Sequence, residues 1–507
     1  MLDAVQPHPD KKKIFVFCDG TGNEFADQPV HERKDANSNV VKLYTAVRVT
    51  NKQVAYYHPG VGTMGDPTIR HRIPRFWSKV KGLAFGYGFK DNVLDAYRYL
   101  MNVYNDGDEI YVFGFSRGAY TARALTGMLH GYGLLCRGNE GHLLYAWNMF
   151  QDQLMHKRGL LKKLRENRRG EQAHSIEHNF AFAQTFSREV TIRFMGIWDT
   201  VSSVGWIYEP LRLLSMAQNP IIQVGRHAVS IDERRAYYRD NLWGPAIKGL
   251  TIKGIQQDII QVWFPGVHSD VGGSYPQEQA APANEALRWM IGEVQRNGAE
   301  LCQERVDMVL GKPSGVYAAD VIYTPPPRQD HRIHDSLTTP WWLLQLFPQQ
   351  YYDKEDGLIQ WRVPYGTPRS IPPDSIIHGS AVRRMQSTVP GEEPYRPRNL
   401  ELDRCSPLPA TPLDTTADLS GCYVYKPAEA QRAKRDGTGF RMAKVAVGWL
   451  TFGLFLLLVA AIAWYVLCLA GLVVRLIIFL MFHTPGVRKV AHFVAGCRHF
   501  FHWHHHW

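Results

Sequence analysis

Short apolar runs alternate with amphipathic stretches along much of the chain. Continuous runs of β-branched and aromatic residues predict strands that are buried on both faces of a parallel sheet, and apolar residues at helical spacing predict helices between them. The expected strands are 14–18, 54–57, 109–113, 190–198 and 259–264, and the expected helices are 37–49, 91–104, 120–129, 228–237 and 284–296. This alternation predicts an α/β fold with a mostly parallel sheet flanked by helices.

The pentapeptide Gly-Phe-Ser-Arg-Gly, residues 114–118, lies between a predicted strand and a predicted helix. Its two glycines permit a sharp turn in which a Cβ would clash. Such a turn exposes the serine beside a helix N-terminus that can receive an oxyanion. The alternative is an ordinary glycine-bounded turn. The strand–turn–helix context favours a nucleophile elbow, with Ser116 as the nucleophile.

A serine nucleophile needs a base, and the base needs an acid that orients it. Asp199 follows the predicted strand 190–198, and His268 follows the strand 259–264. The chain order Ser116, Asp199, His268 is the order of α/β-hydrolase triads. Because the carboxyl ends of parallel strands lie at one edge of the sheet, we expect these side chains to meet there. The alternatives are a turn or helix cap for Asp199 and a structural role for His268.

The oxyanion hole is expected to use the backbone N–H of Arg117, the residue after the nucleophile. Gly20 and Thr21 are the candidates for a second N–H, because a glycine-rich loop follows the strand 14–18. Asp19 opens that loop, where it serves as a cap or orders the loop.

Other residues compete for the roles of acid and base. Asp270 is a rival acid or an orienting neighbour, and His378 and His334 are rival bases. Carboxylates and histidines at strand ends also suit metal ions. A metal-dependent phosphohydrolase is therefore the alternative, and its ligands would be Asp19, Asp199, His268 and Asp270. A serine triad would need neither a metal nor a cofactor.

The C-terminal part of the chain differs in composition. Residues 445–474 carry no formal charge, and a run of about 20 such residues is enough for a helix to cross a bilayer. The sequence therefore predicts a transmembrane region over 445–482. It follows a linker and basic juxtamembrane segment, 401–444, and precedes a histidine- and aromatic-rich tail, 483–507, that is typical of an interfacial end.

Composition and charge narrow the function further. The net charge of +11 and the pI of about 9.2 favour contact with anionic surfaces. The basic residues are scattered and no nucleic-acid motif is evident, so we expect no nucleic-acid partner. The seven cysteines form no C-x-x-C pair, which argues against a zinc module or a disulfide framework, although Cys405 and Cys422 are candidates for one bond. No signal peptide is visible at the N-terminus.

Seven segments along residues 12–400 carry a family resemblance. They are CDGTGNE (18–24), YYHPGVGT (56–63), GDEIYVFGFSRGAYTAR (107–123), GIWDTVSSVG (196–205), DERRAYY (232–238), WFPGVHSDVGGSY (263–275) and IIHGSAVRRM (376–385). Together they resemble the uncharacterised α/β-hydrolase domain family that includes the type VI secretion phospholipase effectors. The resemblance implies an α/β-hydrolase-like fold, Ser116, Asp199 and His268 as the triad, and lipid ester hydrolysis, often as a phospholipase A.

The expected organisation is a flexible N-terminus, 1–11, and a hydrolase domain, 12–400, before the linker. The domain includes a helical insertion at 140–190 and a loop-rich cap at 312–400. The expected partners are phospholipid and a membrane. An exported effector would also need an immunity protein and a secretion chaperone or spike. A third hypothesis is a membrane-inserting protein whose hydrolase core is inactive.

Overall fold

The computed structural model describes most of the predicted hydrolase domain. The described residues are 11–20, 37–60, 88–156, 180–201, 205–206, 209–210, 218–276, 279–311, 333–346, 348–352, 359–387, 395–408, 415–427 and scattered positions between 446 and 479. The predicted flexible terminus 1–11 lies almost wholly outside them. The chain divides into two compact units, residues 1–345 with 365–435, and residues 346–364 with 436–507.

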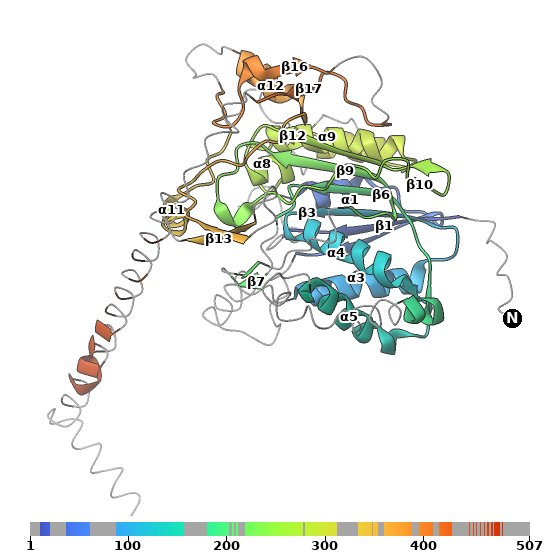
Figure 1. Ribbon diagram of the computed structural model, residues 1–507, viewed down its shortest axis with the longest axis horizontal. Helices are drawn as coiled ribbons and strands as arrows, with labels where there is room; N and C mark the ends of the chain where they lie inside the picture. The colour runs from blue at the N-terminus through green and yellow to red at the C-terminus, as the bar shows by residue number, and fades with distance from the viewer. Residues whose placement is uncertain are drawn as a thin grey trace, which may run out of the picture. The chain divides into compact units, whose positions relative to one another are not determined.

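A nine-stranded sheet forms the centre of the first unit (Figure 1). Its strands, in order across the sheet, are β16 (Cys405–Pro407), β17 (Tyr423–Tyr425), β15 (Ser375–Ile377), β12 (Asp258–Phe264), β9 (Ile222–Ser230), β6 (Ile192–Trp198), β3 (Glu109–Phe115), β1 (Lys13–Cys18) and β2 (Gln53–His58). Every neighbouring pair from β2 to β15 is parallel, whereas β17 runs antiparallel to β15 and β16. The mostly parallel sheet confirms the predicted α/β class.

Helices flank this sheet and short pairs of strands lie outside it. The helices are α1 (Asn39–Ala46), α3 (Phe89–Val103), α4 (Arg117–Tyr132), α5 (Leu143–His156), α8 (His268–Gly272), α9 (Ala281–Arg296), α10 (Gln303–Val309), α11 (Thr339–Gln345) and α12 (Gly379–Gln386), with 3-10 turns η2 (Glu140–His142), η5 (Ala236–Tyr238) and η7 (Leu402–Arg404). The two-stranded pairs are β4 (Leu134–Leu135) with β5 (Ser187–Arg188), β7 (Gly205–Trp206) with β8 (Glu209–Pro210), β10 (Thr251–Ile252) with β11 (Ile255–Gln256), and β13 (Gln349–Tyr352) with β14 (Ile359–Arg362).

Strand side chains alternate between two cores, one on each face of the sheet. Ile14 and Val16 of β1 belong to a core that includes residues of α3, α4 and α5, whereas Phe15 and Phe17 belong to one that includes residues of α1, α9 and α10. Figure 1 shows α3, α4 and α5 on one side of the sheet and α9 on the other. All four of these β1 side chains are fully buried, which explains why the strand reads as one continuous apolar run.

The segment 228–237 was predicted as a helix, and this prediction is wrong. Its first residues complete β9, and only the short η5 turn follows. All nine residues of β9 are buried, and they include Gln223, Arg226 and His227. Buried polar residues interrupt the apolar pattern on which strand prediction depends, so the strand was missed.

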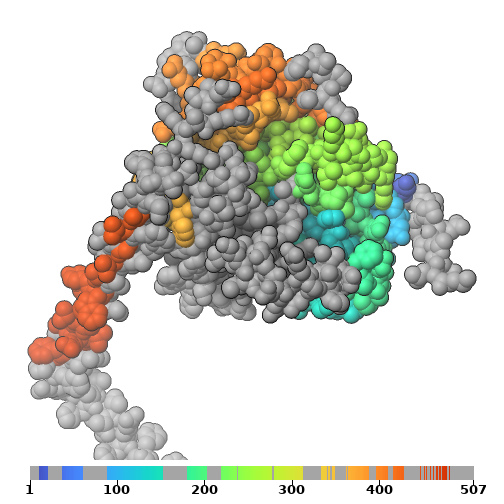
Figure 2. Space-filling view, in the orientation of Figure 1, coloured from blue at the N-terminus to red at the C-terminus, as the bar shows by residue number. Residues whose placement is uncertain are grey.

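The sheet also extends beyond the predicted domain boundary. Residues 312–400 were expected to form a cap and 401–444 a linker, but β15, β17 and β16 add to the edge next to β12. Ile377 and Tyr425 pack with Val229 and Trp263 in a third apolar cluster. In Figure 2 the orange part of the chain lies directly against the yellow-green part. Cys405 and Cys422 lie in this part of the fold, and both are free thiols.

None of the helices among the described residues is both long and apolar enough to cross a membrane. The predicted transmembrane region, 445–482, therefore has no support from that part of the chain. Most of this region and all of 483–507 lie outside the described residues, as does segment 157–179 of the helical insertion.

A buried charge network ties α9 to the sheet. Arg226 of β9 donates to Glu293 of α9 at 2.6 Å and to Asp258 of β12 at 2.7 Å. The side chains of Arg226 and Glu293 are fully buried. Removing one partner of such a network leaves uncompensated charge in the interior.

We expect Arg226→Met to destabilise the fold by about 3–5 kcal/mol, because Glu293 and Asp258 would lose their shared cation. Urea unfolding followed by circular dichroism measures the change. Arg288→Met is the matched control, because Arg288 makes an exposed pair with Glu285 on the same helix, and it should cost less than about 1 kcal/mol. Equal effects of the two variants would contradict a structural role for the network.

Candidate active site

Ser116 lies in a strained turn between β3 and α4. Its backbone φ is 58° and ψ is −122°, a conformation that non-glycine residues adopt rarely and that is typical of functional sites. Its N–H donates to the carbonyl of Trp198 at the end of β6, at 3.1 Å. This hydrogen bond fixes the turn beside the strand that carries Asp199. The strand–turn–helix context expected of a nucleophile elbow is therefore present.

The glycines on either side of Ser116 are required by close backbone packing. A Cβ on Gly114 would lie 2.6 Å from Ala119 Cα and from the Gly118 carbonyl oxygen. A Cβ on Gly118 would lie 2.1 Å from the carbonyl oxygen of Cys18, at the end of β1. The elbow thus packs directly on the strand end that opens the loop at Asp19.

The three predicted triad residues follow strands of the same parallel sheet. Ser116 follows β3, Asp199 follows the adjacent strand β6, and His268 follows β12 and begins α8. Asp199 also has a positive φ, 36°, and its N–H donates to Ala228 of β9 at 2.7 Å. All three side chains are buried at this edge, so the expectation that the turn exposes Ser116 is wrong.

Asp199 and His268 form a direct pair. His268 Nδ1 lies 2.5 Å from Asp199 Oδ2, which leaves Nε2 for other partners. Nε2 is buried and has no hydrogen-bond partner in the described part of the chain. The ring of Phe115, the residue before Ser116, stacks on the His268 ring with centroids 4.6 Å apart. His268 therefore lies against the elbow, with the nitrogen opposite Asp199 available for a nucleophile or substrate.

Arg369 is a second partner of Asp199, and the sequence did not predict it. Arg369 Nη1 lies 2.5 Å from Asp199 Oδ1, and Nη2 lies 3.1 Å from Oδ2. The Ser230 N–H, at the end of β9, also donates to Oδ1 at 2.9 Å. Arg369 comes from the proline-rich segment before β15, which was predicted as a cap, and no sequence motif singled it out.

These contacts decide which groups are charged. Burial opposes ionisation of Asp199, but the Arg369 guanidinium and the hydrogen bond from His268 outweigh it and hold the pKa of Asp199 well below its usual range. Burial lowers the pKa of His268, and the bond to Asp199 offsets only part of that effect. The site therefore holds a carboxylate and a neutral imidazole near neutral pH, the pair that a general base requires.

The DERRAYY segment surrounds the other side of His268. Glu233 accepts the backbone N–H of His268 at 3.2 Å and also binds Arg235 through two nitrogens, at 2.9 and 2.7 Å. Arg235 covers the ring of Tyr238 at 3.6 Å, and Tyr238 meets the His268 ring edge-on at 4.7 Å. These residues lie in a motif of the sequence resemblance, but the helix predicted there gave no sign that they contact His268.

Asp270, the rival acid, pairs with another histidine. Its Oδ1 lies 2.6 Å from His334 Nδ1, and its Oδ2 accepts the N–H of Val267 and so caps α8. His334 also lies against Tyr275 in a stacked arrangement. Asp270 and Asp199 thus bind different histidines, and the ring of His268, the partner of Asp199, stacks on Phe115 of the elbow.

His378, the other rival base, caps a helix. It is the N-cap of α12, with Nδ1 2.8 Å from Ser380 Oγ, and its ring stacks on Phe264. Burial lowers the pKa of His378 to about 4. These contacts give it a structural role beside β12.

The predicted oxyanion loop is partly described. Asp19 Oδ1 accepts the N–H of Gly20 at 2.6 Å and the hydroxyl of Ser38 at 2.7 Å, and Oδ2 accepts the Tyr57 hydroxyl at 2.8 Å. Asp19 therefore joins the end of β1 to Ser38 and Tyr57, and the N–H of Gly20 already has an acceptor. Thr21 lies outside the described residues, and Arg117 begins α4, where N–H groups favour anions.

The carboxylates and histidines of the metal hypothesis do not form one cluster. Within the described ranges, no three histidine, cysteine or acidic side chains come together in a way that could hold a metal ion. Asp199 is bound by Arg369 and His268, and Asp270 by His334. Asp19 is engaged by hydroxyl donors instead.

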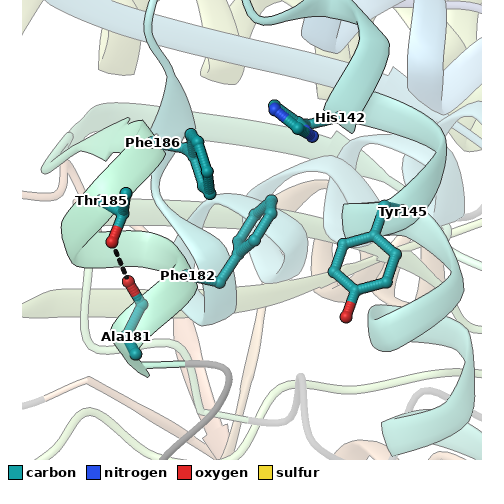
Figure 3. Close-up of a pocket in the computed structure, with 6 residues that line it drawn as sticks. All are labelled: His142, Tyr145, Ala181, Phe182, Thr185 and Phe186. Atoms are coloured by element: carbon teal, nitrogen blue, oxygen red, sulfur yellow. Dashed lines mark hydrogen bonds between the residues drawn. The ribbon is translucent and has the colours of Figure 1, made fainter.

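A surface hollow of roughly 420 Å³ lies on the helical insertion (Figure 3). Its lining residues are His142, Tyr145, Ala181, Phe182, Thr185 and Phe186. None of the predicted site residues lines it. The hollow is mainly aromatic, and the insertion also exposes Leu144 and Phe180.

The fold and the site together define a class: an α/β protein with a serine, a histidine and an aspartate at the carboxyl edge of a mostly parallel sheet. The sequence matches the family model described as "T6SS, Phospholipase effector Tle1-like, catalytic domain" over residues 12–293. The match covers more than half of the chain, so the chain belongs to this family of Tle1-like phospholipase effector catalytic domains. The family predicted from the sequence motifs is confirmed.

Two further proteins are similar to parts of the chain. The uncharacterized protein YEL023C of Saccharomyces cerevisiae is 33% identical over 247 residues, which are 47% of this chain and 34% of that protein. The chain thus matches only about a third of the length of this relative. An uncharacterized protein from Pseudomonas aeruginosa, solved as a crystal structure, is 17% identical, with a TM-score of 0.32 over 62% of this chain and 49% of that one.

The elbow geometry makes a steric prediction. In an α-helix, Gly→Ala normally stabilises by roughly 1 kcal/mol, but at Gly118 the added Cβ would collide with the end of β1. We expect Gly118→Ala to destabilise by about 1–3 kcal/mol, as overpacking does. Thermal and urea unfolding measure this change.

Gly141→Ala is the control, because nothing lies within 4 Å of the Cβ it would add. That variant should unfold at the same urea concentration as the parent chain or slightly above it, because alanine restricts the unfolded chain. A Gly118→Ala variant as stable as the parent would show that the elbow does not pack on β1 in the way described.

Proposed function

We propose that this chain is a serine-dependent lipid ester hydrolase, of phospholipase A type, on an α/β-hydrolase-like fold. Ser116 is the nucleophile, His268 the base and Asp199 the acid that orients the base. The observation that carries the proposal is the 2.5 Å bond between His268 Nδ1 and Asp199 at the sheet edge that holds the strained Ser116 turn. Family membership supports the lipid ester as the substrate class.

In the proposed reaction, Ser116 Oγ attacks the acyl carbonyl carbon and His268 Nε2 takes the hydroxyl proton. The N–H of Arg117 stabilises the oxyanion that forms. His268 then returns the proton to the leaving alcohol, which departs as a lysolipid, and the acyl group stays on Ser116. Water attacks this ester with the help of the same histidine, which releases the fatty acid and restores the serine.

The charge and the tail of the chain suit a lipid surface. The net charge of +11 favours approach to anionic headgroups. The uncharged run 445–474 is long enough to insert into a bilayer if it forms a helix. We therefore propose that the protein acts while associated with a membrane through the C-terminal region.

The effector role is a further part of the proposal, and family membership alone supports it. An exported phospholipase would endanger the membranes of the cell that makes it. An immunity protein that blocks the site and a chaperone or secretion spike that shields the apolar tail are the partners such a protein needs.

We expect Ser116→Ala and His268→Asn each to lower lipid hydrolysis by at least about 10³-fold, because triad members act as a unit. Lipid product analysis by mass spectrometry on phospholipid vesicles measures the loss and shows which ester bond is cut. Labelling of the full chain by a fluorophosphonate should disappear in Ser116→Ala.

His378→Asn is the matched control for His268→Asn, because asparagine is also a good helix N-cap. It should keep hydrolysis close to that of the parent. Hydrolysis that survives Ser116→Ala, or that is lost in His378→Asn with the fold intact, would overturn the assignment of the triad.

The pKa of His268 predicts the pH dependence. A base acts while neutral, and burial lowers the pKa of His268 below its ordinary value. We expect kcat/KM for a soluble ester to be level above about pH 6.5, the usual histidine pKa, and to fall only at lower pH. Initial rates across the acid and neutral range test this, with circular dichroism at each pH to exclude unfolding. A midpoint above neutral pH would contradict the assigned base.

A further inference from the structure

Arg369 contacts other parts of the site besides Asp199. Besides both carboxylate oxygens of Asp199, Nη1 donates to Ser230 Oγ at 2.7 Å and Nε donates to the carbonyl of Tyr238 at 3.1 Å. The side chain of Arg369 is almost fully buried. One guanidinium therefore links the acid, the end of β9 and the residue whose ring borders His268.

The fork shape of the guanidinium matters for this arrangement. A planar guanidinium can bind both oxygens of a carboxylate at once, whereas an ammonium acts as a single point charge. With both oxygens bound, the Asp199 carboxylate cannot rotate away from His268 Nδ1. The cation also offsets the cost of burying the Asp199 anion, which would otherwise favour a neutral acid.

The cation also acts on the base. The groups that face His268 and Asp199 from the surrounding elements are His227 on β9, Glu233 and Arg235 in the DERRAYY segment, Tyr238 on η5, Asp240 and Arg369, together with Asp270 on α8. Of these, only Arg369 donates to the Asp199 carboxylate that His268 also binds. Positive charge there weakens the attraction of Asp199 for protonated imidazole, so the base stays neutral to lower pH.

We propose that Arg369 is a positioning residue for the reaction: it holds Asp199 in the orientation that receives His268 and limits the basicity of His268. This inference rests on the triad proposed above. It assigns a role in the reaction to the proline-rich segment before β15, which supplies the cation that binds the Asp199 carboxylate.

Two substitutions separate charge from geometry. In Arg369→Met the cation is lost, so His268 binds a proton more tightly. The acid limb of the pH profile, where kcat/KM falls at low pH, should therefore have a midpoint at least one pH unit higher than in the parent chain. At pH values well below the parent midpoint, that shift makes the loss of rate about tenfold greater than the loss at alkaline pH. In Arg369→Lys the cation stays, so the limb should stay in place while kcat falls and KM is unchanged, because one ammonium cannot hold both oxygens.

Arg226→Lys is the matched control, because it replaces another buried arginine in an ion network away from the triad. It should alter the unfolding midpoint without changing the acid limb or kcat. A purely structural role for Arg369 would lower the rate equally at every pH in Arg369→Met. That result, or a parental kcat in Arg369→Lys, would overturn the proposal, and the lysine variant alone decides it if the methionine variant does not fold.

A measurement without turnover separates this inference from the proposed activity. The His268 ring is followed by NMR in histidine-labelled chain, and its signal is identified by its absence in His268→Asn. The midpoint of its titration should lie higher in Arg369→Met than in the parent chain. An unchanged midpoint overturns the role of Arg369, whereas a parent chain that lacks Ser116-dependent hydrolysis overturns the proposed function and leaves this titration interpretable.

Discussion

The site depends on the hydrogen bonds and the ion pair that the Asp199 carboxylate forms. This carboxylate is buried at the edge of the sheet and accepts hydrogen bonds from His268, Arg369 and the backbone of Ser230. A buried carboxylate is costly unless it is both paired and fully hydrogen-bonded. Three separate parts of the chain must therefore come together before Asp199 can sit there as an anion. The geometry of His268 is thus coupled to complete folding of the sheet and of the segment that precedes β15.

Close backbone contact is the second constraint on this edge. Gly118 packs against the end of β1 with no room for a Cβ, and Ser116 and Asp199 both adopt positive φ values. Such conformations persist only where the surrounding structure determines them strongly. Here that support comes from the parallel neighbours: the N–H of Ser116 binds the end of β6, and the N–H of Asp199 binds β9. The order of the strands thus provides the backbone hydrogen bonds that stabilise the unusual conformation of both residues.

Polar groups also lie within the sheet itself. Arg226 and His227 are fully buried in β9, where Arg226 binds carboxylates from β12 and α9, and His227 binds the side chain of Gln261. A strand that carries such groups is stable because each group is satisfied by a neighbouring element. The same feature removes the apolar pattern by which a strand is recognised along the chain.

The sequence by itself determined the parts of this protein that depend on local order. Continuous apolar runs predicted β1, β3, β6 and β12, and the glycines around Ser116 predicted the sharp turn, because burial and steric crowding leave a direct trace in residue type. Ser116, Asp199 and His268 each follow a predicted strand, so the sequence also placed each of them at a strand end. Only the tertiary structure decided which histidine meets which aspartate. Asp199 pairs with His268 and Asp270 with His334, because pairing depends on which loops lie side by side. Arg369, the partner of Asp199 from far along the chain, left no local pattern, since a buried ion pair is defined by distance in space and not by spacing in sequence.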